Sequence, residues 1–107
     1  MAVNVQRDQE TLRITGLRSL GAANARDFRR EVSAALQPGL HAIAIDLSET
    51  SFMDSSGLAA LLDLHKTAGL DDGSVTIRLL NPSRPVQQLL ELTRVDQILP
   101  VVNDSAL

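Results

Sequence analysis

The sequence predicts an α/β fold with a mixed, mostly parallel sheet of four to five strands, an N-terminal hairpin and three to four helices. Short apolar segments of strand length alternate with amphipathic segments of helix length, as in parallel sheets joined by helical crossovers. Two alternating segments at the start of the chain, separated by a polar turn, predict the antiparallel hairpin. The chain has 107 residues and contains no repeat or linker, so we expect a single domain over residues 1–107.

The first half of the chain predicts the hairpin, one helix and a central strand. The segments VNV and LRI, at residues 3–5 and 12–14, alternate apolar and polar side chains on either side of the turn RDQE. Residues 22–36 place their apolar side chains on one helical stripe, and Pro38 follows as a stop signal. HAIAIDL, at residues 41–47, is nearly continuously apolar, which is typical of a strand buried on both faces.

The second half of the chain predicts two helices and two strands. The leucine-rich residues 55–68 form the next helix, and VTIRLL at residues 75–80 forms the next strand. NPSRP supplies capping residues and an early proline for a third helix over residues 86–94. The last strand, ILPVV at residues 98–102, is expected at a sheet edge, because Pro100 cannot donate a hydrogen bond to a neighbouring strand.

Composition argues against several classes of partner and cofactor. The net charge of −3 and the lack of Tyr and Trp are unfavourable for binding nucleic acid, which requires a basic surface and stacking side chains. No apolar stretch is long enough to span a membrane, and the N-terminus lacks the apolar core of a signal peptide. We therefore expect a cytoplasmic protein with no membrane partner. The chain has no Cys, and neither His41 nor His65 has acidic residues at metal-ligand spacing, so we expect no metal and no cofactor.

Sequence motifs for catalysis are also missing. The chain contains no GxxxxGK[ST] phosphate loop, no GxGxxG and no HExxH. Ser55 can be imagined as a nucleophile with a histidine as its base, but no G-x-S-x-G motif surrounds it. We therefore expect a protein that is not an enzyme and has no catalytic residues.

The segment DSSG, from Asp54 to Gly57, lies between a predicted strand and a predicted helix. Asp and Ser are favoured helix N-caps, so the simplest interpretation is that DSSG only caps the helix. A second interpretation is a phosphorylation site, with Ser55 at the cap and its hydroxyl clear of the helix end. A phosphate on Ser55 would then face free backbone N–H groups and the positive end of the helix dipole. The pattern does not choose between Ser55 and the alternate site Ser56.

A helical wheel divides the helix that follows DSSG into two faces. Three leucines and a histidine share the predicted inner face, namely Leu58, Leu61, Leu62 and His65. Mostly small or polar residues fall towards the outward side, namely Ser56, Ala60, Asp63, Leu64 and Thr67. Leu64 is then either a singly exposed leucine or part of a binding surface. We predict that the corner and this outward side bind a partner through Asp54, Ser55, Ser56, Gly57, Ala60 and Leu64.

The segment IAIDLSETSFMDSSGLAALLDLHK resembles the signature of the STAS domain, named for sulfate transporters and anti-sigma-factor antagonists. It is most similar to the free-standing antagonists, in which an apolar strand and a short polar loop precede D-S-S/T-G-L at the start of a helix. LRITG and NPSRPVQQLLELTRVDQIL are similar to further family elements in the same order. The resemblance spans about residues 3–102 and implies the STAS fold.

The resemblance also implies a function. An antagonist of this family binds an anti-sigma factor, usually a serine kinase, and thereby frees a sigma factor. The kinase phosphorylates the residue that corresponds to Ser55, which abolishes binding, and a serine phosphatase reverses the modification.

One departure from the family pattern leaves an alternative open. Many phosphorylated antagonists carry an acidic residue shortly after the strand-ending glycine, whereas Gly16 is followed here by LRSLGAANA, which has no carboxylate. The alternative is a STAS subunit of a lipid-transport or stress-signalling assembly that is not switched by phosphorylation.

Overall fold

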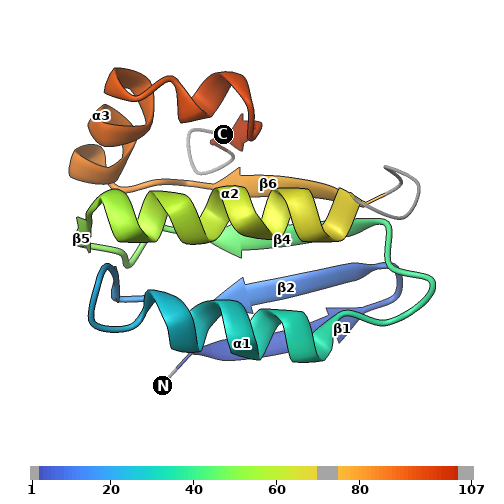
Figure 1. Ribbon diagram of the computed structural model, residues 1–107. Coiled ribbons are helices and arrows are strands. Elements are labelled where there is room, and N and C mark those ends of the chain that lie inside the picture. Colours follow the sequence, from blue (N-terminus) through green and yellow to red (C-terminus); the bar gives the residue numbers. More distant parts are fainter. Residues whose placement is uncertain (1–2, 70–74, 104–107) are drawn as a thin grey trace.

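The computed structural model describes residues 3–69 and 75–103, and within them a five-stranded sheet forms one layer of the molecule (Figure 1). Its strands are β1 (Asn4–Asp8), β2 (Thr11–Thr15), β4 (Ala42–Asp46), β6 (Thr76–Leu80) and β7 (Val101–Val102), in the spatial order β1-β2-β4-β6-β7. The pair β1–β2 is antiparallel and every other pair is parallel. The predicted mixed sheet with an N-terminal hairpin is therefore confirmed.

The helices of the described residues are α1 (Ala25–Ala35), α2 (Ser55–Gly69), α3 (Arg84–Leu92) and a short 3-10 helix, η1 (Val95–Gln97). Figure 1 shows α1 and α2 side by side on one face of the sheet, while α3 lies at the end of the molecule near β5. Both α1 and α2 begin at the end of the sheet where the parallel strands finish, so they run in the same direction. This arrangement follows from parallel strands joined by helical crossovers.

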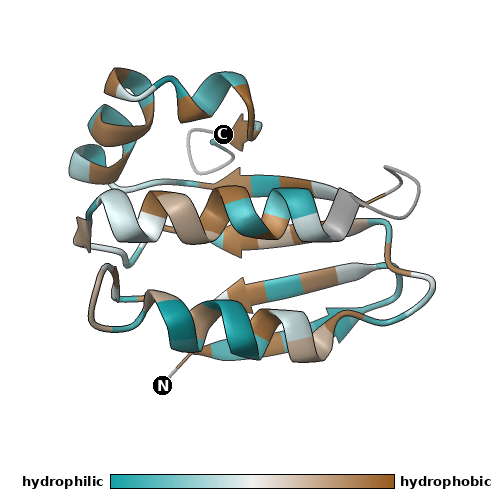
Figure 2. Ribbon diagram, viewed as in Figure 1, coloured by the Kyte–Doolittle hydropathy of each residue, from teal (hydrophilic) through white to brown (hydrophobic). Residues whose placement is uncertain are grey.

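The hydrophobic core fills the space between the sheet and these helices. Alternate side chains of three central strands point into it, because successive side chains of a strand face opposite sides. They are Leu12, Ile14, Ile43, Ile45, Ile77 and Leu79. Phe28 and Val32 of α1 are fully buried against them. The front of α1, which faces away from the sheet, is largely hydrophilic (Figure 2).

A second, two-stranded parallel sheet was not predicted. It pairs β3 (Ser19–Leu20) with β5 (Phe52–Met53). Two residues per strand show no alternation that a sequence pattern can reveal. Through this pairing, the segment that follows Gly16 lies beside the residues that lead into α2. There the Asp54 N–H donates a hydrogen bond to the Leu20 carbonyl at 3.4 Å.

The inner face predicted for α2 is confirmed at Leu58 and Leu61, which are buried, but the orientation of the helix is shifted from the prediction. Ala60 and Leu64, expected on the outward side, are each only 1% exposed, whereas His65, expected inside, is exposed. The helix is turned by about one residue, roughly 100°. The physical reason is that α2 packs against α1 as well as against the sheet. Leu64 fills the space between the two helices and belongs to the core.

Three element boundaries also differ from the prediction. The first helix begins at Ala25 and not at residue 22, because the Asn24 and Ala25 N–H groups both donate to the Gly21 carbonyl in a preceding turn. The third helix begins earlier than predicted, at Arg84. In the predicted last strand only Val101–Val102 is extended, because the preceding residues continue from the turn of η1.

The burial of Leu64 predicts a large loss of stability on truncation. We expect Leu64→Ala to lower the free energy of unfolding by about 2–5 kcal/mol, as for other buried leucines. His65→Ala, one residue along and exposed, should change it by about 0.5 kcal/mol or less. Urea denaturation of both variants measures the difference. A larger loss for His65→Ala would contradict the orientation of α2 described here.

Candidate functional site: the corner between β5 and α2

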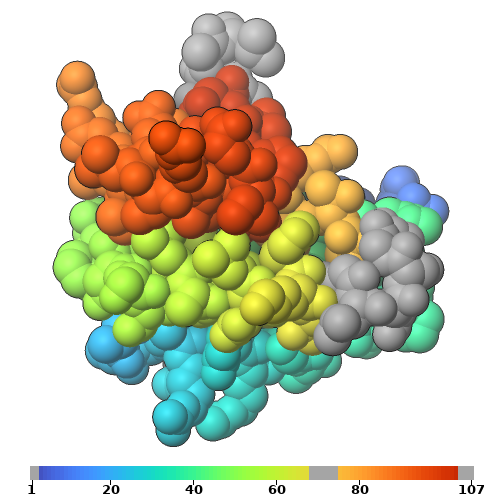
Figure 3. Space-filling model, turned by 45° about the horizontal axis from the view of Figure 1, so that its top comes forward, coloured from blue at the N-terminus to red at the C-terminus, as the bar shows by residue number. Residues whose placement is uncertain are grey.

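Ser55 is the first residue of α2 and lies where the chain leaves β5. It is exposed, whereas Ser56 is half-buried. Within the described part of the chain, the Ser55 hydroxyl has no hydrogen-bond partner. Figure 3 shows the start of α2, in light green, at the surface of the molecule. The hydroxyl of Ser55 is thus available to another protein without any unfolding.

The N-cap of α2 is Asp54, which corrects the expectation that Ser55 is the cap. The Oδ1 atom of Asp54 accepts hydrogen bonds from the N–H of Ser56 at 2.9 Å and of Gly57 at 3.1 Å. Its Oδ2 atom accepts one from the N–H of Ala22 at 3.2 Å. An aspartate that binds the first free N–H groups of a helix is the preferred N-cap arrangement.

These hydrogen bonds keep Asp54 ionised. The N–H of Gly57 contributes most, and those of Ala22 and Ser56 add to it, so the pKa of Asp54 lies below its ordinary value although partial burial opposes the shift. The corner therefore carries a fixed negative charge at neutral pH. The free N–H groups that were expected to face a phosphate on Ser55 are already bound by this carboxylate.

Two glycines allow three segments to meet at the corner. A Cβ atom at Gly57 would lie 2.1 Å from the carbonyl oxygen of Leu20, so the first turn of α2 packs directly on the backbone of β3. A Cβ atom at Gly21 would lie 2.8 Å from Cε2 of Phe52 and 2.9 Å from Oδ2 of Asp54. The contact at Gly57 requires a residue without a side chain, because the Leu20 oxygen is part of the backbone, whereas a Cβ atom at Gly21 would meet side-chain atoms.

The six residues predicted to bind a partner occupy different environments. Ser55 is exposed, Asp54 and Ser56 are half-buried, and Gly57, Ala60 and Leu64 are buried. The corner brings the first three together at the surface. The prediction that Ala60 and Leu64 bind a partner is wrong, because both side chains are buried in the core. Gly57 is also buried, and its contact with the Leu20 backbone explains why a glycine occupies this position.

Sequence reasoning missed Phe52 at this corner. Its side chain is 54% exposed, while that of the next residue, Met53, is 8% exposed. The two side chains point in opposite directions, as adjacent residues of a strand do, but a strand of two residues gives no sequence signal for this. Ala22 and Ala23, from the loop before α1, are also exposed.

The remaining candidate residues lie apart from the corner. His41 is exposed, with its Nε2 atom 3.9 Å from Oε1 of Glu10, and His65 is exposed on α2. Among residues 3–69 and 75–103, no three His, Asp or Glu side chains are grouped so that they could hold a metal ion. In the same ranges, the helices are too short or too polar to cross a bilayer.

The contact between Gly57 and Leu20 predicts that even a methyl group at this position is harmful. We expect Gly57→Ala to lower the free energy of unfolding by about 1–3 kcal/mol or more, because the first turn of α2 must move away from β3. Ser55→Ala, two residues earlier and exposed, should cost about 0.5 kcal/mol or less. Thermal and urea unfolding provide the comparison. Equal stability of the Gly57→Ala variant and the unmodified chain would refute the close approach.

The lowered pKa of Asp54 predicts a loss of stability in acid. A carboxyl group with a lowered folded-state pKa stabilises the fold above its unfolded pKa of about 3.9, and this contribution is lost as the pH falls through the folded-state value. Asp54→Asn keeps a capping side chain that does not titrate. The stability advantage of the unmodified chain over Asp54→Asn should therefore shrink between pH 7 and about pH 2. Urea denaturation across this range measures it, and an advantage independent of pH would be incompatible with the cap.

Comparison with known proteins identifies the family to which this sequence is similar. The model of the STAS domain family matches residues 2–106. An anti-sigma F factor antagonist of Paenibacillus polymyxa is 32% identical over 62 residues, which are 58% of this chain and 51% of that protein. The match therefore spans about half the length of this curated relative.

Solved structures show the same fold. A crystal structure of a Thermotoga maritima protein aligns with a TM-score of 0.84 at 21% identity, over 95% of this chain and 86% of that one. The anti-sigma factor antagonist SpoIIAA in its unphosphorylated form aligns with a TM-score of 0.76 at 23% identity, over 98% and 91% of the two chains. SpoIIAA of Bacillus in the phosphorylated form gives 0.68 at 22% identity, over 98% and 95%. Because the family model covers almost every residue and the structures share its architecture, this chain belongs to the STAS domain family.

Proposed function

We propose that this chain is an anti-sigma factor antagonist that binds an anti-sigma factor in the cytoplasm and so frees a sigma factor. Phosphorylation of Ser55 switches it off. The observation that carries the proposal is the exposed hydroxyl of Ser55 at the start of α2, which has no hydrogen-bond partner among residues 3–69 and 75–103. The Paenibacillus relative is an antagonist of this kind, and SpoIIAA has both phosphorylated and unphosphorylated forms, which supports the proposal.

The position of Asp54 explains why a phosphate on Ser55 acts on binding and not on folding. A phosphate adds a charge of about −1.5 to −2 at neutral pH. The N–H groups of Ser56 and Gly57 are already bound by Asp54, so the helix end has few donors left for the phosphate. The new charge stands beside an ionised carboxylate and extends towards solvent. It is therefore repelled from any partner surface that buries the corner.

The partner surface that we propose is centred on Ser55 and Phe52. An exposed aromatic side chain is a typical anchor of a protein interface, because it buries a large apolar area with little loss of conformational entropy. Asp54 and Ser56 border this surface, and Ala22 and Ala23 extend it without steric hindrance. A phosphate beside Phe52 would have to lose its hydration when the partner docks, which makes the phosphorylated complex unfavourable.

The proposal requires three partner activities and none from the chain itself. The anti-sigma factor is a serine kinase that both binds the corner and phosphorylates Ser55. A serine phosphatase restores the hydroxyl. The chain acts as a regulator by binding and not as an enzyme.

The second candidate is a STAS subunit of a lipid-transport or stress-signalling assembly without a phosphate switch. The observation that favours it is the composition of the loop beside the corner. Many phosphorylated antagonists have an acidic residue shortly after the strand-ending glycine, whereas Gly16 is followed here by LRSLGAANA, so no carboxylate from this segment can contact a kinase. In this case the corner binds its partner constitutively.

The switch predicts opposite effects for two substitutions at Ser55. Ser55→Ala should bind the copurifying anti-sigma factor in the presence of ATP as tightly as the unmodified chain does without it, because no phosphate can be added. Ser55→Asp should bind at least about tenfold more weakly, although one carboxylate imitates only part of a phosphate. Ser51→Ala and Ser56→Ala are matched controls and should leave phosphorylation intact. Calorimetry measures binding, and mass spectrometry locates the phosphate.

The outcomes separate the two candidates. Phosphate on Ser56 alone would correct the residue and keep the mechanism. If a competent kinase modifies neither Ser55 nor Ser56, the phosphorylation switch is wrong and the constitutive subunit is favoured. Copurification with a membrane transporter would favour the lipid-transport assembly.

A further inference from the structure

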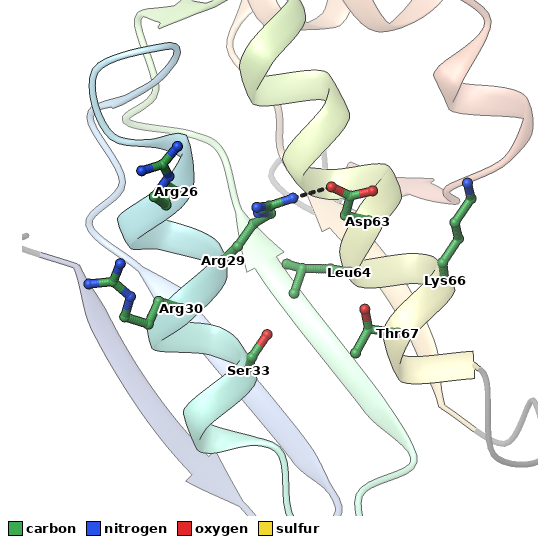
Figure 4. Close-up of a pocket in the computed structure, with 8 residues that line it drawn as sticks. All are labelled: Arg26, Arg29, Arg30, Ser33, Asp63, Leu64, Lys66 and Thr67. Carbon is green, nitrogen blue, oxygen red and sulfur yellow. Dashed lines mark hydrogen bonds and ion pairs between the residues drawn. The ribbon is translucent and has the colours of Figure 1, made fainter.

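A groove of about 410 Å³ runs between α1 and α2 on the side of the helices away from the sheet (Figure 4). Leu64 forms part of its floor, and the hydroxyls of Ser33 and Thr67 lie at one end. Four cationic side chains line it, namely Arg26, Arg29, Arg30 and Lys66, together with the carboxylate of Asp63. We call this surface the basic groove. We propose that the basic groove is a second docking surface, separate from the Ser55 corner, and that it binds an acidic segment of a partner protein.

The charge of the basic groove is opposite to that of the whole chain. The formal net charge of the chain is −3, yet the groove has four cations and one anion. Asp63 is paired with Arg29 in an ion pair drawn in Figure 4. Arg26, Arg30 and Lys66 form no ion pair with any described residue. The acidic residues of α1, Asp27 and Glu31, do not line the groove.

The arrangement of the cations fits a chain of carboxylates better than one compact anion. Figure 4 shows Arg29 reaching across to Asp63, while Arg30 extends from the side of α1 away from α2 and Lys66 extends from the side of α2 away from α1, so the cations do not converge on a point. Arg26 and Arg30 are four residues apart and therefore about 6 Å apart along the helix axis. A single phosphate or carboxylate is bound tightly when several donors converge on it. Cations spread along two helices instead match several negative charges along an extended or helical segment.

Other polyanions fit this surface less well. A surface that binds a membrane combines cations with exposed apolar anchors. Among the described residues the large exposed apolar side chains are Phe52, Leu92, Ile98 and Val102, and none of them is on α1 or α2. Single-stranded nucleic acid needs stacking side chains, and the chain has no Tyr or Trp. An acidic protein segment needs neither feature.

Asp63 competes with an acidic partner for Arg29, because the two side chains form an ion pair within the basic groove. Both side chains are nearly half exposed, at 44% and 46%, so their attraction is screened and weak. A carboxylate of the partner can replace Asp63 on Arg29. Removing the charge of Asp63 should therefore strengthen binding, an effect that a damaged fold cannot imitate.

The test measures binding of a fluorescein-labelled decaglutamate peptide by fluorescence anisotropy at about 50 mM salt, where screening is modest. The double variant Arg26→Glu with Arg30→Glu should bind about tenfold more weakly. The matched control is Arg13→Glu with Arg78→Glu, two exposed arginines that flank Ala44 on the other face of the sheet. This control should change the affinity less than about twofold, and Asp63→Asn should tighten binding about twofold.

Three results would overturn the proposal. Equal losses for the two double variants would mean that the peptide senses only net charge. Weaker binding of the peptide by Asp63→Asn would mean that Asp63 does not compete with the peptide for Arg29. Tighter binding of phosphatidylserine vesicles or of an oligonucleotide than of decaglutamate would assign the groove to a membrane or to nucleic acid. Ser55→Asp should bind the peptide as the unmodified chain does, so this test stands whether or not Ser55 is a switch.

Discussion

The carboxylate of Asp54 joins two segments that are far apart in the sequence, at the corner where we propose that a partner binds. One oxygen binds the first turn of α2 and the other binds the N–H of Ala22, just before α1. The two helices, which run side by side in the same direction because parallel strands precede them, are thus linked where they begin. Ser55 lies beside this junction, and the groove between α1 and α2 extends from it along the two helices.

Most of the fold could be predicted because its signals are local. Alternation identified the hairpin of β1 and β2, and an apolar run identified β4 as a central strand. The orientation of α2 could not be predicted in the same way. A stripe through Leu58 and Leu62 and a stripe through Ala60 and Leu64 both contain Leu61 and are both apolar. The choice between them is made by contact with α1, which is not encoded within the helix.

The site was predicted in part for a similar reason. DSSG marks a helix start, but three of its residues are able to cap, and the true cap depends on where the helix begins, which sequence patterns locate to within one or two residues. Asp54 is the cap because α2 begins at Ser55 and the Oδ1 atom of Asp54 accepts from the N–H groups of Ser56 and Gly57, while its Oδ2 atom binds the N–H of Ala22 in a distant segment. Phe52 was missed because β5 is too short to show a pattern. The arginines of α1 lie off its apolar stripe, and a pattern within α1 does not reveal that α2 places Asp63 opposite Arg29.

The two edges of the sheet limit how this chain can meet another protein. β1, at one edge, has exposed polar side chains at Gln6, Arg7 and Asp8, and β7, at the other, has two residues and follows Pro100. Charged, short or proline-flanked edge strands resist the addition of a foreign strand. Recognition by β-augmentation, in which a peptide extends a sheet through its backbone, is thus disfavoured at both edges. At the proposed corner and groove, specificity would consequently come from side chains displayed on helices and corners, which can change by substitution while the backbone pairing of the sheet stays the same.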